Sequence, residues 1–231
     1  MKLSLALLAA FFSVPTQAKW GMMFRGGGGR GGGGGAGGGG GGNGGALADL
    51  FVDPPPPLSD AEKAEIKFMY EEEKMARDVY NVLGGQWENR VFSNIAASEQ
   101  KHMDNMWRLV TYFGLDLDDD VDPTNGQGDF ENPRLKEFFD TQTGTGSTSR
   151  LAAFGVGALI EEVDINDLRD AIGETQVEVL KAVYNNLLNA SYNHLRAFVR
   201  NYEANGGGTY VAQTAVSGLT QTEVNAILGR N

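Results

Sequence analysis

The sequence predicts an all-α protein, a four-helix bundle of two antiparallel hairpins with a long crossover between the second and third helices. Three observations lead to this prediction. Four long segments carry apolar residues at the spacing of a helix with one buried face. Short loops join the first two segments and the last two, whereas residues 114–148 separate the two pairs. The expected helices cover residues 59–84, 92–114, 149–173 and 175–205.

The ends of the helices are marked by capping residues. Ser59 followed by Glu62 forms a capping box at the start of the first helix, and Gly84 with its neighbouring glycine marks the end. Thr175 followed by Glu178 predicts a second capping box at the start of the fourth helix. These signals place each hairpin loop between two helices.

The crossover is too long for a simple turn and suits a connection that runs the length of the bundle. Asn132 followed by Pro133 predicts one short helix within it. Its acidic run, Asp116 to Asp122, is predicted to be a solvated charge run, because Pro123 stands where a calcium loop requires glycine. After Gly206 we expect a loose tail ending in a weak helix.

The N-terminal region predicts export. Lys2, the apolar residues 3–14 and the small residues 16–18 are typical of a secretory signal, so we expect a periplasmic or secreted protein. Residues 26–45 are almost pure glycine and residues 54–57 are proline, which predicts a flexible tether followed by a stiff spacer. The resulting division is a signal peptide at 1–18, a linker at 19–57, the bundle at 58–205 and a tail at 206–231.

Composition excludes several classes of protein. The sequence has no cysteine, which excludes disulfides, a thiolate zinc site and an iron–sulfur cluster. It has 19 basic and 30 acidic residues, and the net charge of −11 argues against nucleic acid as a partner. No segment approaches the roughly 20 apolar residues needed to span a membrane, so we expect no membrane span. Any bound metal must therefore be held by oxygen and imidazole.

Each predicted helix has an apolar stripe that a polar residue interrupts near its middle. The interruptions are carboxylates or the only two histidines of the chain. In the second stripe a glutamate precedes a histidine by three residues, a spacing that puts both side chains on one helix face. The four stripes are Ile66, Met69, Glu73, Ala76, Tyr80, Leu83; Phe92, Ile95, Glu99, His102, Met106, Leu109, Phe113; Leu151, Phe154, Ala158, Glu161, Ile165, Leu168, Ile172; and Val177, Leu180, Tyr184, Leu187, Ser191, His194, Phe198.

A polar layer of this kind predicts a metal site. Burying an isolated ionised carboxylate costs several kcal/mol, so three glutamates and two histidines in one layer need a shared cation or shared protons. A divalent metal supplies that compensation and holds the histidines in the neutral form. The register leaves alternatives open, because Glu71 to Glu73 are consecutive and a stripe through Glu72 is nearly as apolar. Glu161 and Glu162 present the same choice.

Three segments carry a resemblance to known families. Residues 73–80 (ExxARxxY) resemble the first-helix motif of rubrerythrins, and residues 95–102 (IAxxExxH) resemble their second-helix motif. Residues 71–80 (EEEKMARDVY), 93–103 (SNIAASEQKHM) and 193–198 (NHLRAF) more closely resemble a prokaryotic ferritin-like family described as domain of unknown function 2202. This resemblance covers about residues 58 to 210.

The resemblance implies a ferritin-like bundle that holds one or two iron ions, or manganese, at its centre. It makes Glu73 a terminal ligand, Glu99 a bridging ligand and His102 a terminal ligand. Glu161 would supply the carboxylate of the third helix, with Asp164 as a partner, and His194 would be the second histidine.

Ser191 departs from this pattern, since a full di-iron site would have a glutamate there. Counted from Glu174, Ser191 lies 17 residues away and Glu161 lies 13 away, a mismatch of about one helical turn. A kink at Asp164 or a π-bulge would absorb the mismatch.

The sequence supports three functional hypotheses. The first is a redox protein acting on oxygen or peroxide, whose electron donor is external because the chain has no cysteine site for one. The second is a non-catalytic carrier of iron or manganese. The third is a metal-free structural or interaction bundle on the glycine-rich tether. The sequence leaves the oligomeric state open.

Overall fold

The computed structural model describes residues 47–115 and 126–230. All of the regular structure in these residues is helical, which confirms the prediction of an all-α protein. None of their helices is long and apolar enough to cross a membrane. The predicted signal peptide, most of the linker and the whole acidic run lie outside the described residues. The helices are α2 Asp60–Trp87, α3 Arg90–Tyr112, α4 Pro133–Gly146, α5 Arg150–Glu174, α6 Glu178–Tyr202, the π-helical η2 Glu203–Gly207, α7 Thr214–Ser217 and α8 Gln221–Ile227.

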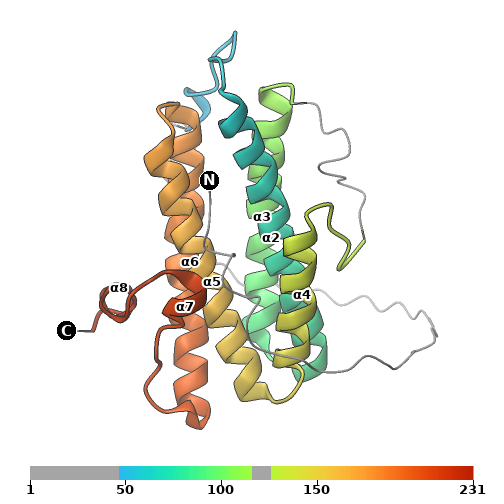
Figure 1. Cartoon of the computed structure of the whole chain (residues 1–231), viewed down its shortest axis with the longest axis vertical. Helices are drawn as coiled ribbons and strands as arrows, with labels where there is room; N and C mark the ends of the chain where they lie inside the picture. Colours follow the sequence, from blue (N-terminus) through green and yellow to red (C-terminus); the bar gives the residue numbers. More distant parts are fainter. Residues whose placement is uncertain (1–46, 116–125, 231) are drawn as a thin grey trace, which may run out of the picture.

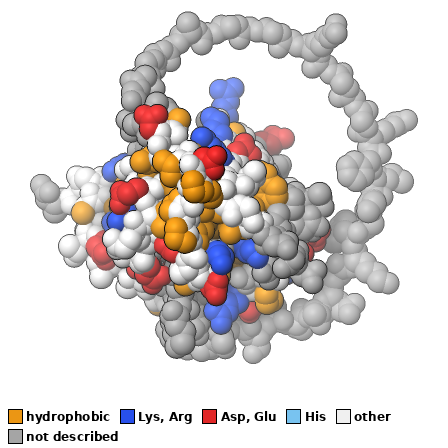
Figure 2. Space-filling view, turned by 90° about the horizontal axis from the view of Figure 1, so that it is seen from above, with side chains coloured by type: hydrophobic (Ala, Val, Ile, Leu, Met, Phe, Trp, Pro, Cys, Tyr) orange, Lys and Arg blue, Asp and Glu red, His pale blue; other side chains and the backbone are white. Residues whose placement is uncertain are grey.

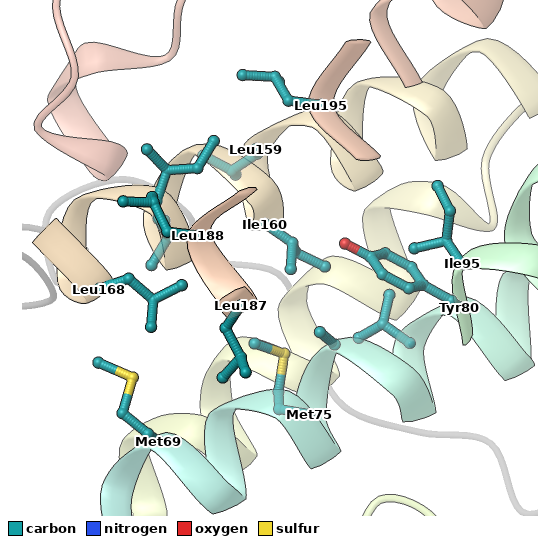
Figure 3. Packing of buried hydrophobic residues seen from close by; sticks show 14 of the residues in the cluster. Met69, Met75, Tyr80, Ile95, Leu159, Ile160, Leu168, Leu187, Leu188 and Leu195 are labelled. Carbon is teal, nitrogen blue, oxygen red and sulfur yellow. The ribbon is translucent and has the colours of Figure 1, made fainter. Parts of the chain in front are cut away.

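The four long helices pack as two antiparallel hairpins, α2 with α3 and α5 with α6 (Figure 1). The hairpins meet through contacts of α3 with α6 and of α2 with α5. The crossover contains α4, which packs on α2 and α5 and is longer than the single short helix that we expected. Apolar side chains from α2, α3, α5 and α6 fill the space between the long helices (Figure 3).

The two ends of α2 differ in how well the sequence predicted them. The capping box of Ser59 and Glu62 is present. At the other end the helix continues through Gly84 to Trp87 instead of ending at the glycines. A Cβ atom at position 84 would lie 3.0 Å from the Cβ of Phe92, so Gly84 allows α2 and α3 to approach closely. This glycine serves helix packing rather than helix termination.

The predicted capping box at the start of α6 is wrong. The N-cap residue is Val177, and its side chain makes no capping hydrogen bond. The Thr175 hydroxyl instead donates to Glu62 Oε1 at 2.6 Å and accepts from the Val177 backbone N–H at 3.1 Å. Thr175 therefore fastens the α5–α6 loop to the first turn of α2, a long-range partner that local sequence does not reveal.

A buried lysine on α2 holds the end of the crossover. Lys74 Nζ donates to Asp78 Oδ2 at 2.8 Å, to the Gly126 carbonyl at 2.7 Å and to the Asp129 carbonyl at 2.8 Å. Asp78 in turn accepts the Gly128 backbone N–H at 3.0 Å. These bonds pair buried charges with backbone groups and fix where the chain enters α4.

The segment after Gly206, expected to be a loose tail, packs on the bundle. Tyr210, Leu219 and Val224 are buried, and α7 lies against α5 (Figure 1). The anchor is Glu162 of α5, whose two carboxylate oxygens accept hydrogen bonds from the tail. The donors are the Tyr210 hydroxyl, the Gln213 backbone N–H and the Ser217 hydroxyl.

We predict that Gly157→Ala destabilises the fold by about 1–3 kcal/mol, because overpacking a filled core forces its neighbours to move. A Cβ atom at position 157 would lie 2.5 Å from the buried ring of Phe198. Gly155→Ala is the matched control on the same helix, since its Cβ would lie 3.7 Å from the nearest ring atom, an ordinary contact. The control should be neutral or stabilising by up to about 1 kcal/mol, because alanine favours a helix. Urea unfolding of both variants measures the difference, and equal stabilities would contradict the prediction.

Candidate metal centre

The structure brings five of the six predicted site residues into one buried cluster. They come from all four long helices, and none has more than 8% of its surface exposed. Because the stripes of the four helices face the same core, side chains far apart in sequence meet at one level of the bundle. The five residues are Glu73 of α2, Glu99 and His102 of α3, Glu161 of α5 and His194 of α6.

Glu99 lies at the middle of this cluster. Its Oε2 is 2.6 Å from His102 Nδ1 and its Oε1 is 2.9 Å from His194 Nδ1. Glu73 Oε2 lies 3.1 Å from His102 Nδ1, and Glu161 Oε2 lies 3.4 Å from His194 Nδ1. The two imidazole rings are 5.6 Å apart at an interplanar angle of 27°. Each histidine is therefore flanked by two carboxylates, and both share Glu99.

The ligand atoms form two triplets, in each of which all atoms lie within 4.8 Å of one another. One consists of Glu73, Glu99 and His102, and the other of Glu99, Glu161 and His194. A set of carboxylate oxygens with one imidazole nitrogen is a ligand set that iron and manganese accept. Two such sets with one carboxylate in common can hold two cations side by side.

The structure settles which of the consecutive glutamates faces the cluster. All of residues 71–73 are buried, but in different surroundings. Glu71 accepts the backbone N–H groups of Glu131 at 2.7 Å and Asn132 at 2.9 Å, at the start of α4. Glu73 faces His102, whereas Glu72 faces α5 near Asp167. On α5 the choice falls on Glu161, because Glu162 is turned towards the tail.

Asp164 lies beside the cluster but belongs to neither triplet. Burial raises the pKa of its carboxyl well above the usual range, and the nearby Glu73 and Glu161 carboxylates raise it further. The Ser191 hydroxyl lowers it. Asp164 of α5 thus supplies a carboxylate next to Ser191, at the position where α6 lacks one.

The expected mismatch of one turn between Glu161 and Ser191 has a simple resolution. Helix α5 is a regular α-helix throughout, without a kink or a π-bulge at Asp164. The loop that reverses the chain lies after Glu174, at residues 175–177. Glu161 is therefore paired with His194, and Asp164 with Ser191.

Tyr80 contacts the cluster, although the sequence placed it two turns away on α2. Its hydroxyl donates to Glu161 Oε1 at 2.6 Å. Figure 3 shows the ring in the core with its hydroxyl pointing inward. A long helical side chain leans towards the N-terminus of its helix, so Tyr80 reaches back to the polar layer. The signal was available in the sequence as a tyrosine on the same stripe as Glu73.

Burial and close pairing shift the pKa of each group in the cluster. Burial raises the pKa of Glu73 to about 7, although His102 opposes the shift. Burial would also raise the pKa of Glu99, but His194 and His102 outweigh it and lower that pKa to about 2. Burial would lower the pKa of His194, but Glu161 and Glu99 raise it to about 10. The metal-free cluster thus holds protons on its histidines.

Several atoms of the cluster have no hydrogen-bond partner among the described residues. Glu73 Oε1, Glu99 Oε1 and His194 Nδ1 are buried without one. Glu99 Oε1 and His194 Nδ1 face each other at 2.9 Å, but not in hydrogen-bond geometry. Buried polar atoms are almost always satisfied, so this concentration of unpaired ligand atoms fits a shared cation.

The fold and the site together define a class of protein, namely an all-helical protein with a buried cluster of glutamates and histidines. The chain belongs to the family described as uncharacterized protein domain (DUF2202), which matches residues 62–230 and so includes the whole cluster. Uncharacterized protein MJ0754 of Methanocaldococcus jannaschii is 41% identical over 165 residues, 69% of this chain and 86% of that protein. The crystal structure of hypothetical protein MJ0754 from Methanococcus jannaschii DSM 2661 has a TM-score of 0.70 at 38% identity, covering 78% of this chain and 98% of that chain.

We predict that the metal-free protein loses stability as the pH rises from about 4.5 to about 10. The folded state holds protons more tightly than the unfolded chain at Glu73, with a pKa of about 7 against 4.5, and at His194, with about 10 against 6.5. The stabilisation from such a group is complete below the pKa of the unfolded chain, and it is lost as the pH rises through the pKa of the folded state. Glu99 acts in the opposite sense, because its pKa in the folded state is about 2 against 4.5 in the unfolded chain. Its contribution to stability is therefore lost as the pH falls below about 4.5.

Urea unfolding in the presence of a chelator, repeated across this pH range, measures the effect. Glu73→Gln should flatten the decline between about pH 4.5 and 7, because that variant lacks the titrating carboxyl. An unfolding free energy that rises from mildly acidic to alkaline pH would contradict the assignment.

Proposed function

We propose that this protein is an exported, ferritin-like protein that binds one or two iron or manganese ions in the core of its helix bundle. The observation that carries the proposal is the pair of ligand triplets that share Glu99. Glu73 and His102 would complete one position, and Glu161 and His194 would complete the other. The predicted signal at residues 1–18 supports export to the periplasm or the exterior.

The ferritin-like assignment rests on connectivity and on the placement of the ligands. Two antiparallel hairpins joined by a long crossover are typical of that architecture. A glutamate three residues before a histidine, here Glu99 and His102 on α3, is typical of its carboxylate-bridged metal sites. The α6 partner lacks the corresponding glutamate, and Asp164 of α5 supplies the additional carboxylate.

The surroundings of the cluster suit a redox centre acting on oxygen or peroxide. A bound iron or manganese ion would supply the electron-transfer chemistry. The chain's own residues hold the ligands in place and exclude water, since the cluster is buried and the Tyr80 hydroxyl fixes one oxygen of Glu161. The chain has no cysteine to hold a second redox centre, so electrons would come from an external donor.

Two alternatives remain distinct from this proposal. A non-catalytic metal carrier would use the same ligands without turnover. A metal-free structural or interaction bundle is favoured by a separate observation, namely that Glu99 lies between two histidines whose protonated forms would balance its charge. Metal content and reactivity separate the three.

We predict that the protein purified from cells supplied with iron and manganese contains one or two of these ions per chain. Glu99→Ala should abolish most of this content, because both triplets lose their common ligand. The effect should exceed the roughly 10- to 100-fold loss of affinity that follows the removal of a single hydrogen bond to a ligand. Elemental analysis of both proteins measures the stoichiometry.

Glu162→Gln is the control for this measurement, since Glu162 is buried next to Glu161 but bonds the tail instead of the cluster. Its metal content should equal that of the wild type. A metal-free wild type under these conditions would contradict the proposed function and leave the structural alternative.

We also predict that the protein loaded with ferrous iron without oxygen consumes oxygen or peroxide faster than the same concentration of free ferrous ion. Holding the ion among buried ligands removes the solvent rearrangement that slows the reaction in water. An oxygen electrode and a peroxide assay measure the rates, with Glu99→Ala as the inactive comparison. A loaded protein that is no faster than free ion would identify a carrier.

A further inference from the structure

The two ligand triplets differ in how their outer carboxylates are held. Glu73 belongs to the triplet of α2 and α3, and Glu161 belongs to the triplet that includes His194 of α6. Both carboxylates are buried, and each faces one histidine through its Oε2 atom. The Oε1 atom of Glu161 accepts the Tyr80 hydroxyl at 2.6 Å, whereas the Oε1 atom of Glu73 has no hydrogen-bond partner among the described residues. Within the described part of the chain, only Glu161 is thus hydrogen-bonded from outside its triplet.

The Tyr80 ring is itself held in place, because aromatic side chains from two other helices pack against it. Its centroid lies 5.0 Å from that of Phe198 on α6 and 6.4 Å from that of Phe92 on α3. Phe92 and Phe198 also pack on each other, with their centroids 5.4 Å apart. Tyr80 has none of its surface exposed, and Figure 3 shows its ring within the core. A ring packed in this way keeps its hydroxyl in one position, so Tyr80 holds Glu161 in one orientation.

The whole cluster lies inside the bundle. None of its five residues has more than 8% of its surface exposed. At the end of the bundle that Figure 2 views, apolar side chains occupy the middle of the face and charged side chains surround them. An ion in such an interior is bound by side chains instead of bulk water, so the orientation of the ligands before binding affects the affinity. A ligand that is already in position costs no ordering when an ion binds, whereas a ligand that must first be ordered weakens binding.

We propose that Tyr80 makes the two metal positions unequal. The position of Glu99, Glu161 and His194 is preformed and binds the first ion, whereas the Glu73 carboxylate becomes ordered only when an ion binds beside it. The inference rests on the proposed function, since it assumes that the centre takes up iron or manganese. Tyr80 is a positioning residue, because it acts on the ion through Glu161. Hydrogen bonds of this kind to a metal ligand typically raise metal affinity about 10- to 100-fold.

The test isolates each position by removing the histidine of the other. His102→Ala leaves the position of Glu161 and His194, and His194→Ala leaves the position of Glu73 and His102. Metal-free full-length protein is titrated with Mn²⁺, and the free ion is measured by electron paramagnetic resonance. His102→Ala should bind one Mn²⁺ at least about tenfold more tightly than His194→Ala does, because only its carboxylate is held by Tyr80.

Adding Tyr80→Phe to each of these variants tests the tyrosine itself. The change removes the hydroxyl and keeps the ring, so the aromatic packing is preserved. In the His102→Ala background it should weaken Mn²⁺ binding about 10- to 100-fold. In the His194→Ala background the affinity should stay within about threefold, because the hydroxyl bonds Glu161 and not Glu73. A loss confined to one position distinguishes a positioning role from a general loosening of the fold.

Tyr184→Phe is the matched control. Tyr184 is another core tyrosine, 1% exposed, and its hydroxyl has no hydrogen-bond partner among the described residues. The control should leave Mn²⁺ binding unchanged in both backgrounds. Circular dichroism melting verifies that each variant is folded. If a histidine variant does not fold, Tyr80→Phe and Tyr184→Phe are compared in the protein with both histidines, where only Tyr80→Phe should weaken the tightest binding step.

Mn²⁺ binding by His194→Ala that is as tight as binding by His102→Ala, or tighter, would overturn the proposed order. An equal loss of affinity in both backgrounds on adding Tyr80→Phe, or no loss in the His102→Ala background, would overturn the role of Tyr80. A wild type that takes up neither Mn²⁺ nor iron contradicts the proposed function itself. The two failures are therefore distinguishable.

Discussion

The constraint on which this structure depends is a carboxylate, Glu99, held between two histidines inside a helix bundle. The Glu99 oxygens lie 2.6 Å and 2.9 Å from the Nδ1 atoms of His102 and His194. An isolated carboxylate or imidazolium in the core would cost several kcal/mol, so Glu99 and the two histidines are stable there only together. That requirement fixes the level at which α3 and α6 face each other, and Glu73 and Glu161 complete the same layer from α2 and α5.

Successive residues of a helix point about 100° apart, and the protein uses this to direct neighbouring acids to different tasks. On α2, Glu71 accepts backbone N–H groups at the start of α4 and Glu73 faces His102, whereas the pKa of Glu72 is raised by burial and by aspartates of α5. On α5, Glu161 faces His194 while Glu162 anchors the tail. Acidic runs that resemble solvated helix faces in the sequence are thereby buried, and each acid lies in different surroundings.

The sequence predicted the long helices well because their signals are local. Ser59 and Glu62 form the expected capping box, and the stripes face a common core. Predictions failed where the partner is distant. Thr175 bonds Glu62 of α2 instead of capping α6, and the tail is held by Glu162, 48 residues before Tyr210. Such contacts leave no periodic pattern in the chain, so only the folded arrangement reveals them.

The sequence by itself determined that the protein is helical, that its only histidines lie on apolar stripes and that any metal must be held by oxygen and nitrogen. The tertiary structure decided which of the adjacent acids meet the histidines, that Tyr80 bonds Glu161 and that Asp164 lies where α6 has only Ser191. Helical periodicity can be read along one chain, whereas these pairings depend on the rotation of each helix about its axis. That rotation is set by packing among all four long helices.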